Sequence, residues 1–181
     1  MIYYHCSPTH NLTLLQPSVS KYFGKPRQVC MTVSLPITLF YAVKNFEYTY
    51  GYTGDGQIYY EEYFPDALRT LYAGKSASLY TCAPTDPQPT RIPNEVVSAQ
   101  PVPVLSETFI PDAYEALLAE EAKGTLRIFR YETLSENRMD WIIQAEAAEI
   151  REKRLWETDS PETDYFRLHY PDSWRLAQRE L

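Results

Sequence analysis

Short strand patterns and helical patterns follow one another irregularly along this chain of 181 residues. The strand patterns are alternating or continuous apolar runs bounded by glycine and proline, whereas the helical patterns repeat every three to four residues. A doubly wound parallel sheet would need a regular strand–helix–strand rhythm, which is absent. The order therefore predicts an α+β fold with a bent or split, antiparallel-rich sheet and flanking helices. The predicted strands lie at 2–6, 27–34, 76–83, 94–100, 101–110 and 125–131, a hairpin at 46–64, and helices at 36–46, 65–74, 111–124 and 135–156.

The chain is long enough, with 44% apolar residues, to bury a substantial core. It becomes mainly helical from Ser135 onward. We therefore predict an α+β domain at residues 1–134 and a helical C-terminal extension at 135–181 that packs on the same domain. The other predicted segments are a turn or short helical piece at 11–17, an exposed loop at 18–26, a proline-rich loop at 84–93, and a polar loop with a short terminal helix at 158–181.

The composition excludes several classes of protein. A formal net charge of −7 disfavours non-specific nucleic-acid binding, which depends on lysine and arginine contacts to phosphates. No apolar run approaches the roughly 18–20 residues that a membrane span needs, and the first residues lack the layout of a secretory signal. The three cysteines form an odd set without C-x-x-C spacing, which disfavours a zinc site and a disulfide framework. These features predict a cytoplasmic protein with reduced thiols and no membrane partner.

The first predicted strand ends in a histidine and a hydroxyl residue, His5 and Ser7. A lone histidine at the end of a strand is more often structural than functional. A nucleophilic pair of His5 and Cys6 is disfavoured, because adjacent strand residues point to opposite faces. A metal site would need more histidines than His10 and the remote His169 supply.

Three short motifs together resemble the ADP-ribosyltransferase-like superfamily, in the branch whose first strand reads Tyr-His-Gly-Ser. The matching residues are Tyr4-His5-Cys6-Ser7, then Cys30-Met31-Thr32, then Phe40-Tyr41-Ala42. The resemblance covers about the first hundred residues and leaves the segment after Ser135 without a counterpart. It implies an ADP-ribosyltransferase-like fold and NAD as the substrate.

The resemblance also implies roles for individual residues. His5 would hold a ribose of NAD, Tyr41 would stack on the nicotinamide ring, and Ser7 and Thr32 would shape the pocket. Neutral imidazole both donates and accepts hydrogen bonds, and an aromatic face suits a partly cationic ring. The sequence departs from the motifs of this superfamily at two places: Cys6 replaces the usual glycine, and Cys-Met-Thr replaces Tyr-Ala-Thr.

A glutamate on a later strand would steady the oxocarbenium-like transition state, because a carboxylate is most effective beside a developing cation in a water-poor site. Glu95 is the first candidate, since Asn94-Glu95 matches the Asn-Glu-Tyr pattern of poly(ADP-ribose) polymerase-like members. Glu107 is the second candidate. Glu61 and Glu62 are the third, although a charged rim at the hairpin explains this pair better.

The leading hypothesis is an NAD-dependent ADP-ribosyltransferase-like enzyme in which His5, Tyr41 and Glu95 act on the nicotinamide–ribose bond. ADP-ribose would pass to an unidentified protein, nucleic acid or water. The alternative is an inactive member of the same fold that acts as a protein-interaction module, which the cysteine at position 6 favours. A third hypothesis is a nuclease-like toxin that uses His5 with a tyrosine.

Overall fold

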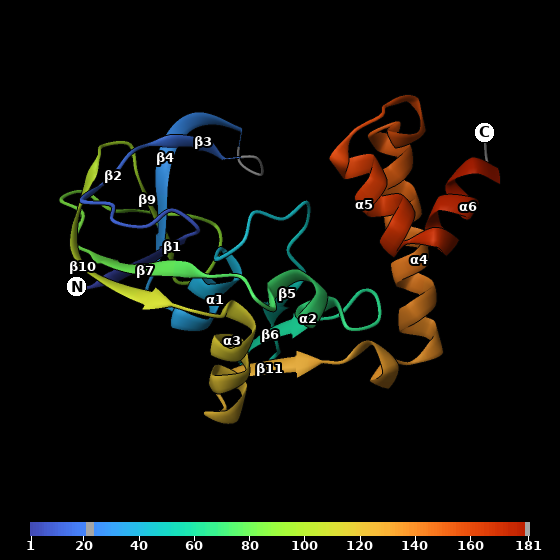
Figure 1. Cartoon of the computed structure of the whole chain (residues 1–181), viewed down its shortest axis with the longest axis horizontal. Helices are drawn as coiled ribbons and strands as arrows, with labels where there is room; N and C mark the ends of the chain where they lie inside the picture. Colours follow the sequence, from blue (N-terminus) through green and yellow to red (C-terminus); the bar gives the residue numbers. More distant parts are fainter. Residues whose placement is uncertain (21–23, 180–181) are drawn as a thin grey trace. The chain divides into compact units, whose positions relative to one another are not determined.

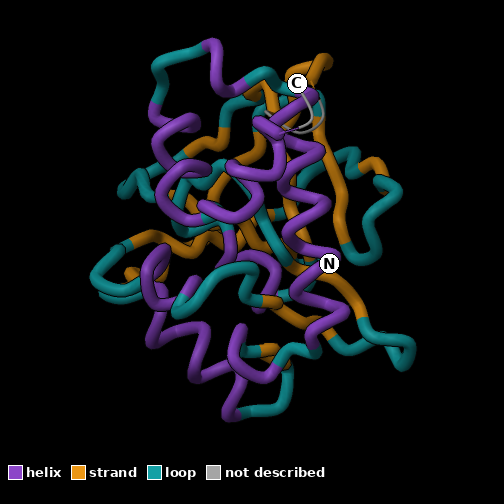
Figure 2. The backbone as a smooth tube through the Cα atoms, turned by 90° about the vertical axis from the view of Figure 1, so that its right-hand side faces the viewer, coloured by secondary structure: helices purple, strands orange, loops and turns teal. Residues whose placement is uncertain are grey.

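The computed structural model of the protein describes residues 1–20 and 24–179. It is a mixed α+β structure with six α-helices and two β-sheets among these residues. Every pairing recorded in the larger sheet is antiparallel. The predicted α+β class with an antiparallel-rich sheet is thereby confirmed. Figure 2 distinguishes helix, strand and loop along the described residues.

The larger sheet has the strand order β2-β10-β7-β1-β4-β9-β8, and β3 pairs with β4 beside this path. Only Tyr4 and Thr32 are matched between β1 and β4, and Figure 1 shows β4 crossing β7 and β10 at a wide angle. The sheet is therefore strongly bent where β1 meets β4. Its strands are β1 (Tyr3–Ser7), β2 (Leu14–Leu15), β3 (Ser18–Ser20), β4 (Gly24–Thr32), β7 (Ala77–Cys82), β8 (Gln88–Pro89), β9 (Glu95–Ser98) and β10 (Val102–Ile110).

One face of the larger sheet carries an apolar core. Successive strand residues point to opposite faces, so residues two apart on β1, β4 and β7 contribute side chains to the same face. The buried residues of this core are Tyr3, Leu15, Val29, Met31, Tyr80, Cys82 and Val102.

Helix α1 (Leu35–Phe40) follows β4 directly and packs against β1, β4 and helix α3 (Ala113–Ala122). Pro36 lies in its first turn, where a missing N–H has no helical partner to lose. The helix ends at Phe40, so it is shorter than the predicted 36–46. The buried hydroxyl of Tyr72, at the end of α2 (Ala67–Tyr72), donates to the Phe40 carbonyl at 3.1 Å.

The chain divides into two compact units that each contain several separate segments. The first unit comprises residues 1–44, 52–58 and 68–127, and the second comprises 45–51, 59–67 and 128–181. This division differs from the predicted boundary at Ser135, because two earlier segments group with the C-terminal helices. Residues of a smaller sheet, with the order β11-β6-β5, belong to both units. Its strands are β5 (Tyr50–Tyr52), β6 (Ile58–Glu61) and β11 (Leu126–Phe129).

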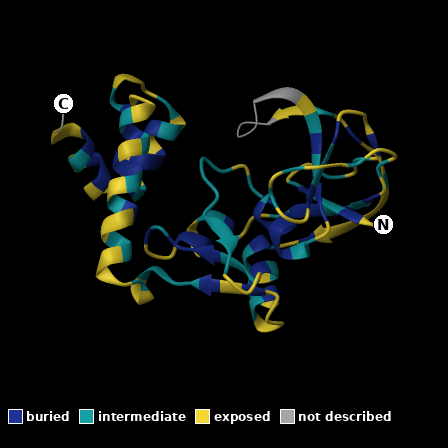
Figure 3. Cartoon of the chain, turned by 180° about the vertical axis from the view of Figure 1, so that it is seen from behind, coloured by how far each residue is buried: buried dark blue, intermediate teal, exposed yellow. Residues whose placement is uncertain are grey.

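The helices of the second unit are α4 (Glu136–Glu152), α5 (Pro161–His169) and α6 (Pro171–Arg179). Helix α4 begins behind Ser135, whose hydroxyl accepts from the Arg138 N–H at 3.3 Å, as the sequence predicts. Exposed and buried residues alternate along α4 in Figure 3, and Ile142, Ala147 and Ile150 lie on its buried side. Short 3₁₀ turns at Tyr131–Thr133 and Leu155–Glu157 flank this helix.

Three irregular segments differ from their predictions. Residues 14–15 form strand β2 instead of the predicted turn or short helical piece. The predicted loop at 18–26 contains β3 and the start of β4, and residues 21–23 of it lie outside the described part of the chain. The C-terminal segment forms two helices, because Ser160 caps α5 and a second proline, Pro171, begins α6.

Candidate functional site

The imidazole of His5 is held in one tautomer by the neighbouring strand. Its Nδ1 lies 2.9 Å from the carbonyl oxygen of Cys30, which can only accept a hydrogen bond, so Nδ1 carries the proton. Burial lowers the pKa of His5, which keeps the ring neutral at pH 7. The Nε2 atom has no hydrogen bond to the described residues and is therefore available as an acceptor.

The strands that carry the first two predicted motifs and Glu95 lie together in one part of the sheet, whereas the third motif lies at the C-terminal end of α1. β1, β4 and β9 are consecutive, and the register matches Tyr4 with Thr32 and Thr32 with Glu95. These three side chains therefore share one face of the sheet. His5 follows Tyr4 on the same strand, so its side chain projects to the opposite face. The structure brings the strands of His5 and Glu95 together but places their side chains on different faces.

Glu95 is a buried carboxyl group with an incomplete set of partners. Only 4% of the residue is exposed, and its Oε1 atom accepts no hydrogen bond from the described residues. Burial raises the pKa of Glu95, and a hydrogen bond from Thr90 opposes the rise only in part. Buried polar atoms in folded proteins nearly always have a partner. The free oxygen of Glu95 is therefore suited to accept a hydrogen bond from a ligand.

A thiol lies close to this carboxyl group. Burial and the negative charge of Glu95 together raise the pKa of Cys30 to about 11. Cys6 is also buried, and burial raises its pKa to about 12. Both thiols are protonated at neutral pH, so neither has the thiolate character of a nucleophile.

Glu107 shares a face of the sheet with His5. The register matches His5 with Tyr80 on β7, and Tyr80 with Glu107 on β10. The Glu107 Oε1 atom accepts from the Ser78 hydroxyl at 2.5 Å and from the Asn11 N–H at 3.0 Å. These bonds, with that of Ser78 the strongest, lower the pKa of Glu107 and keep it ionised.

The Ser78 hydroxyl connects Glu107 to a second histidine. A hydroxyl has one proton, and Ser78 donates it to the carboxylate, so His10 Nδ1 must donate to Ser78 across 2.7 Å. Ser78 is completely buried, which excludes it as a nucleophile. Sequence reasoning missed this chain of contacts, because Ser78 is separated by 68 positions from His10 and by 29 from Glu107, and no local pattern links them.

The remaining predicted pocket residues have local partners. The Ser7 hydroxyl accepts from the Thr9 N–H at 3.1 Å, and the buried Thr32 hydroxyl accepts from the Ser34 N–H at 3.0 Å. Tyr41 is half-buried at the C-terminal end of α1. These contacts stabilise the ends of β1, β4 and α1, and they leave the predicted roles in ligand binding untested.

The glutamates of the hairpin are buried, in contrast to the charged rim that the sequence suggested. Glu61 forms an ion pair with Arg138 at 2.5 Å, and Glu62 accepts from the Tyr131 N–H at 3.2 Å. The difference arises because α4 and the residues before it supply partners distant in sequence. Both carboxylates are thus part of the structure of the second unit.

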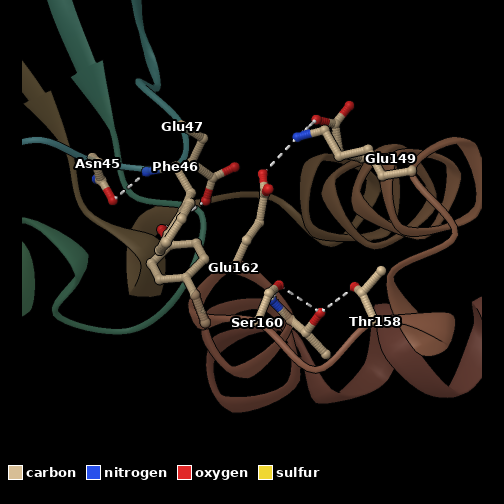
Figure 4. Close-up of polar contacts among 10 residues, drawn as sticks. Asn45, Phe46, Glu47, Glu149, Thr158, Ser160 and Glu162 are labelled. Carbon is tan, nitrogen blue, oxygen red and sulfur yellow. Dashed lines mark hydrogen bonds and ion pairs between the residues drawn. The ribbon is translucent and has the colours of Figure 1, made fainter. Parts of the chain in front are cut away.

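The second unit also contains a network of charged and hydroxyl groups (Figure 4). Lys153 contacts Glu149 at 2.5 Å and Glu162 at 2.9 Å. The Thr163 hydroxyl lies 2.9 Å from that of Thr158 and 3.0 Å from that of Ser160, which fixes the first turn of α5. These contacts are local and explain the structure of the helices.

Within residues 1–20 and 24–179, no three His, Cys, Asp or Glu side chains are grouped so that they could hold a metal ion. The same residues include no helix with the length and apolar character needed to cross a lipid bilayer. Comparison with protein-family models, with curated proteins and with solved structures returned no match to this chain.

Proposed function

We propose that the protein binds NAD and acts as an ADP-ribosyltransferase-like enzyme. The bond between C1′ of the ribose and nicotinamide breaks, and nicotinamide leaves with the bonding electrons. A nucleophile of the acceptor then bonds to C1′ and loses its proton. The observation that best supports this proposal is the free, buried oxygen of Glu95, on the strand next to the one that orients His5.

The reaction is favoured by a carboxylate beside the ribose. Positive charge develops on the sugar as nicotinamide leaves, and a negative group in a buried site stabilises it more strongly than one in water. A ribose hydroxyl that donates to Oε1 of Glu95 would complete the partners of this atom. It would also favour the ionised form and so offset the rise in pKa that burial causes.

The face of the sheet on which each predicted residue lies decides its role. His5 offers Nε2 as an acceptor on the face opposite Glu95, so the two side chains cannot contact the same ribose. We therefore place the reacting ribose at Glu95 and give His5, and Ser7 on the same face as His5, no contact with it. Tyr41 stacks on the nicotinamide ring, and Thr32, on the face of Glu95, borders the pocket.

The test follows nicotinamide release from millimolar NAD by the wild-type chain and two matched variants. Glu95→Gln keeps the shape of the side chain and removes its charge, so we expect release to fall by about 10²–10³-fold. Glu107→Gln makes the same change on the opposite face and should leave release within about threefold of wild type. The reverse result would move the site to the face of Glu107. The proposal would be refuted if the wild-type chain neither bound NAD nor released nicotinamide.

The alternative function is a protein-interaction module with the same fold and no chemistry. Two observations favour it: the separation of His5 and Glu95 on opposite faces, and the exposure of Leu105 and Phe109 on β10, at 59% and 60%. Calorimetry with NAD discriminates between the two functions. Heat of binding together with nicotinamide release supports the enzyme, and the absence of both supports the module.

A further inference from the structure

The residues before Glu95 form a tight turn that sets the position of its carboxyl group. The Glu95 N–H donates to the Ile92 carbonyl at 3.2 Å, and the Thr90 N–H donates to the Glu95 carbonyl at the same distance. Asn94 has a φ of 64°, in the left-handed region. Asparagine adopts this region more readily than other non-glycine residues, but the region is still less favourable than the right-handed or extended one, so contacts from outside the turn help to stabilise it.

Two contacts from distant segments supply that support. The Val33 N–H donates to the Asn94 carbonyl at 3.1 Å, and the Tyr52 hydroxyl donates to the Pro93 carbonyl at 2.7 Å. Tyr52, Val33 and the turn all belong to the first compact unit. Two successive carbonyl groups directly before Glu95 are therefore fixed, one by β5 and the other by the residue that follows β4.

The Tyr52 hydroxyl is also electrostatically close to the carboxyl group. Burial raises the pKa of Tyr52, a hydrogen bond with the Asn94 side chain opposes the rise, and the charge of Glu95 adds to it. The tyrosine thus lies beside both the turn and its functional side chain. No other described contact is made to the Pro93 carbonyl.

We infer that Tyr52 is a positioning residue, whose hydroxyl fixes the turn at 92–95 so that the free oxygen of Glu95 stays directed toward the ribose hydroxyl. This inference rests on the proposed function. Loss of the hydroxyl releases the Pro93 carbonyl and lets the turn leave its left-handed conformation. Substrate affinity should change little, because the hydroxyl is occupied by the protein backbone and not by the ligand.

The test compares Tyr52→Phe with Tyr114→Phe in the full chain. Tyr114 is a suitable control, because its hydroxyl makes no hydrogen bond to the described residues and lies in the same unit. In Tyr52→Phe, the amides of Val33 and Glu95 should exchange with deuterium about five- to tenfold faster. The kcat for nicotinamide release should fall about tenfold or more, with the KM for NAD within about twofold of wild type.

Two results would overturn the inference while the proposed function stands. One is amide exchange in Tyr52→Phe equal to that in Tyr114→Phe. The other is faster exchange with unchanged kcat, in an enzyme that Glu95→Gln inactivates. An inactive wild-type chain would instead refute the proposed function itself, and with it the role of Tyr52. Coinciding melting temperatures of the two variants exclude general unfolding as the cause of faster exchange.

Discussion

His5 and Glu107 lie in one row across the sheet, on either side of Tyr80. The side chains of this row share a face, because matched residues of neighbouring strands point the same way. The hydroxyl of Tyr80 donates to the Thr9 carbonyl at 2.7 Å, accepts from the Leu12 N–H at 3.2 Å and lies 3.3 Å from Glu107. Tyr80 thereby holds the segment that follows His5 over the sheet.

This arrangement predicts that Tyr80→Phe destabilises the protein. Tyr80 is completely buried, and removal of its hydroxyl leaves a backbone donor and a backbone acceptor without their partner. The free energy of unfolding should fall by about 1–3 kcal/mol. Denaturant unfolding measures this as a lower midpoint with an unchanged m-value. Tyr114→Phe is the control, and equal midpoints for the two variants would contradict the prediction.

Lysine should replace Arg138 only in part. The Arg138 guanidinium lies 3.9 Å from the centre of the Trp141 ring and forms two close contacts with the buried Glu61, through Nε at 3.0 Å and Nη2 at 2.5 Å. Arg138→Met leaves the Glu61 charge uncompensated and should cost about 3 kcal/mol in the free energy of unfolding.

Arg138→Lys retains the charge but loses the planar group over the Trp141 ring and the paired N–H contacts with Glu61. Its loss in the free energy of unfolding should therefore be intermediate. The double variant Glu61→Gln with Arg138→Met should recover part of the loss, because no buried charge then remains unpaired. Additive effects in this double-mutant cycle would show that the two residues do not interact.

A proton shared by Glu47 and Glu146 should make stability fall as pH rises. The Glu47 carboxyl accepts from the hydroxyls of Tyr165, at 2.9 Å, and Tyr170, and it is hydrogen-bonded to Glu146. Burial first, and then the charge of Glu47, raise the pKa of Glu146 from 4.5 to about 9. The folded state therefore keeps a proton that the unfolded chain releases above pH 4.5.

Stability from this group is complete below pH 4.5 and is lost progressively as pH rises toward 9. Glu146→Gln can donate the same hydrogen bond without ionising, so it should reduce the dependence between pH 5 and 9. Part of the dependence should remain, because burial also raises the pKa of Glu47. Unfolding by denaturant at several pH values measures both slopes. Parallel curves for the wild type and the variant would refute the shared proton.

The three cysteines should resist alkylation in the native protein. Burial raises the pKa of Cys6 to about 12 and that of Cys82 to about 11, and that of Cys30 is raised to about 11. All three are free thiols. Iodoacetamide at pH 8 should therefore modify few native molecules within an hour and all three thiols in denaturant, as mass spectrometry would record. Rapid labelling of a single cysteine in the native protein would show an accessible thiolate.

Local sequence patterns were sufficient for most elements of the fold. Asp112 accepts from the Tyr114 N–H at 2.9 Å and begins α3, and Ser135 begins α4, as their residue types predict. The hairpin around Gly56 also follows from local turn signals. From the sequence we predict one short terminal helix after residue 158, whereas the structure has two, α5 and α6. Ser160-Pro161 is itself a typical start of a helix.

The candidate site was less predictable, because the register between strands is a long-range property. Alternation within β1 shows that Tyr4 and His5 point to opposite faces. It does not show that Thr32 is the residue matched with Tyr4, and this match decides the face of Glu95. The hydrogen bond between Tyr52 and Pro93 joins residues 41 positions apart and has no sequence signature either.

The second compact unit is assembled from three separate stretches of chain: 45–51, 59–67 and 128–181. A single cut in the gene, such as one before Ser135, would separate the stretches 45–51 and 59–67 from the C-terminal helices of the same unit. Recombination could exchange this unit as a whole only by replacing all three stretches together. Exchange of one unit without the other is therefore disfavoured, and the two units should share the same evolutionary history.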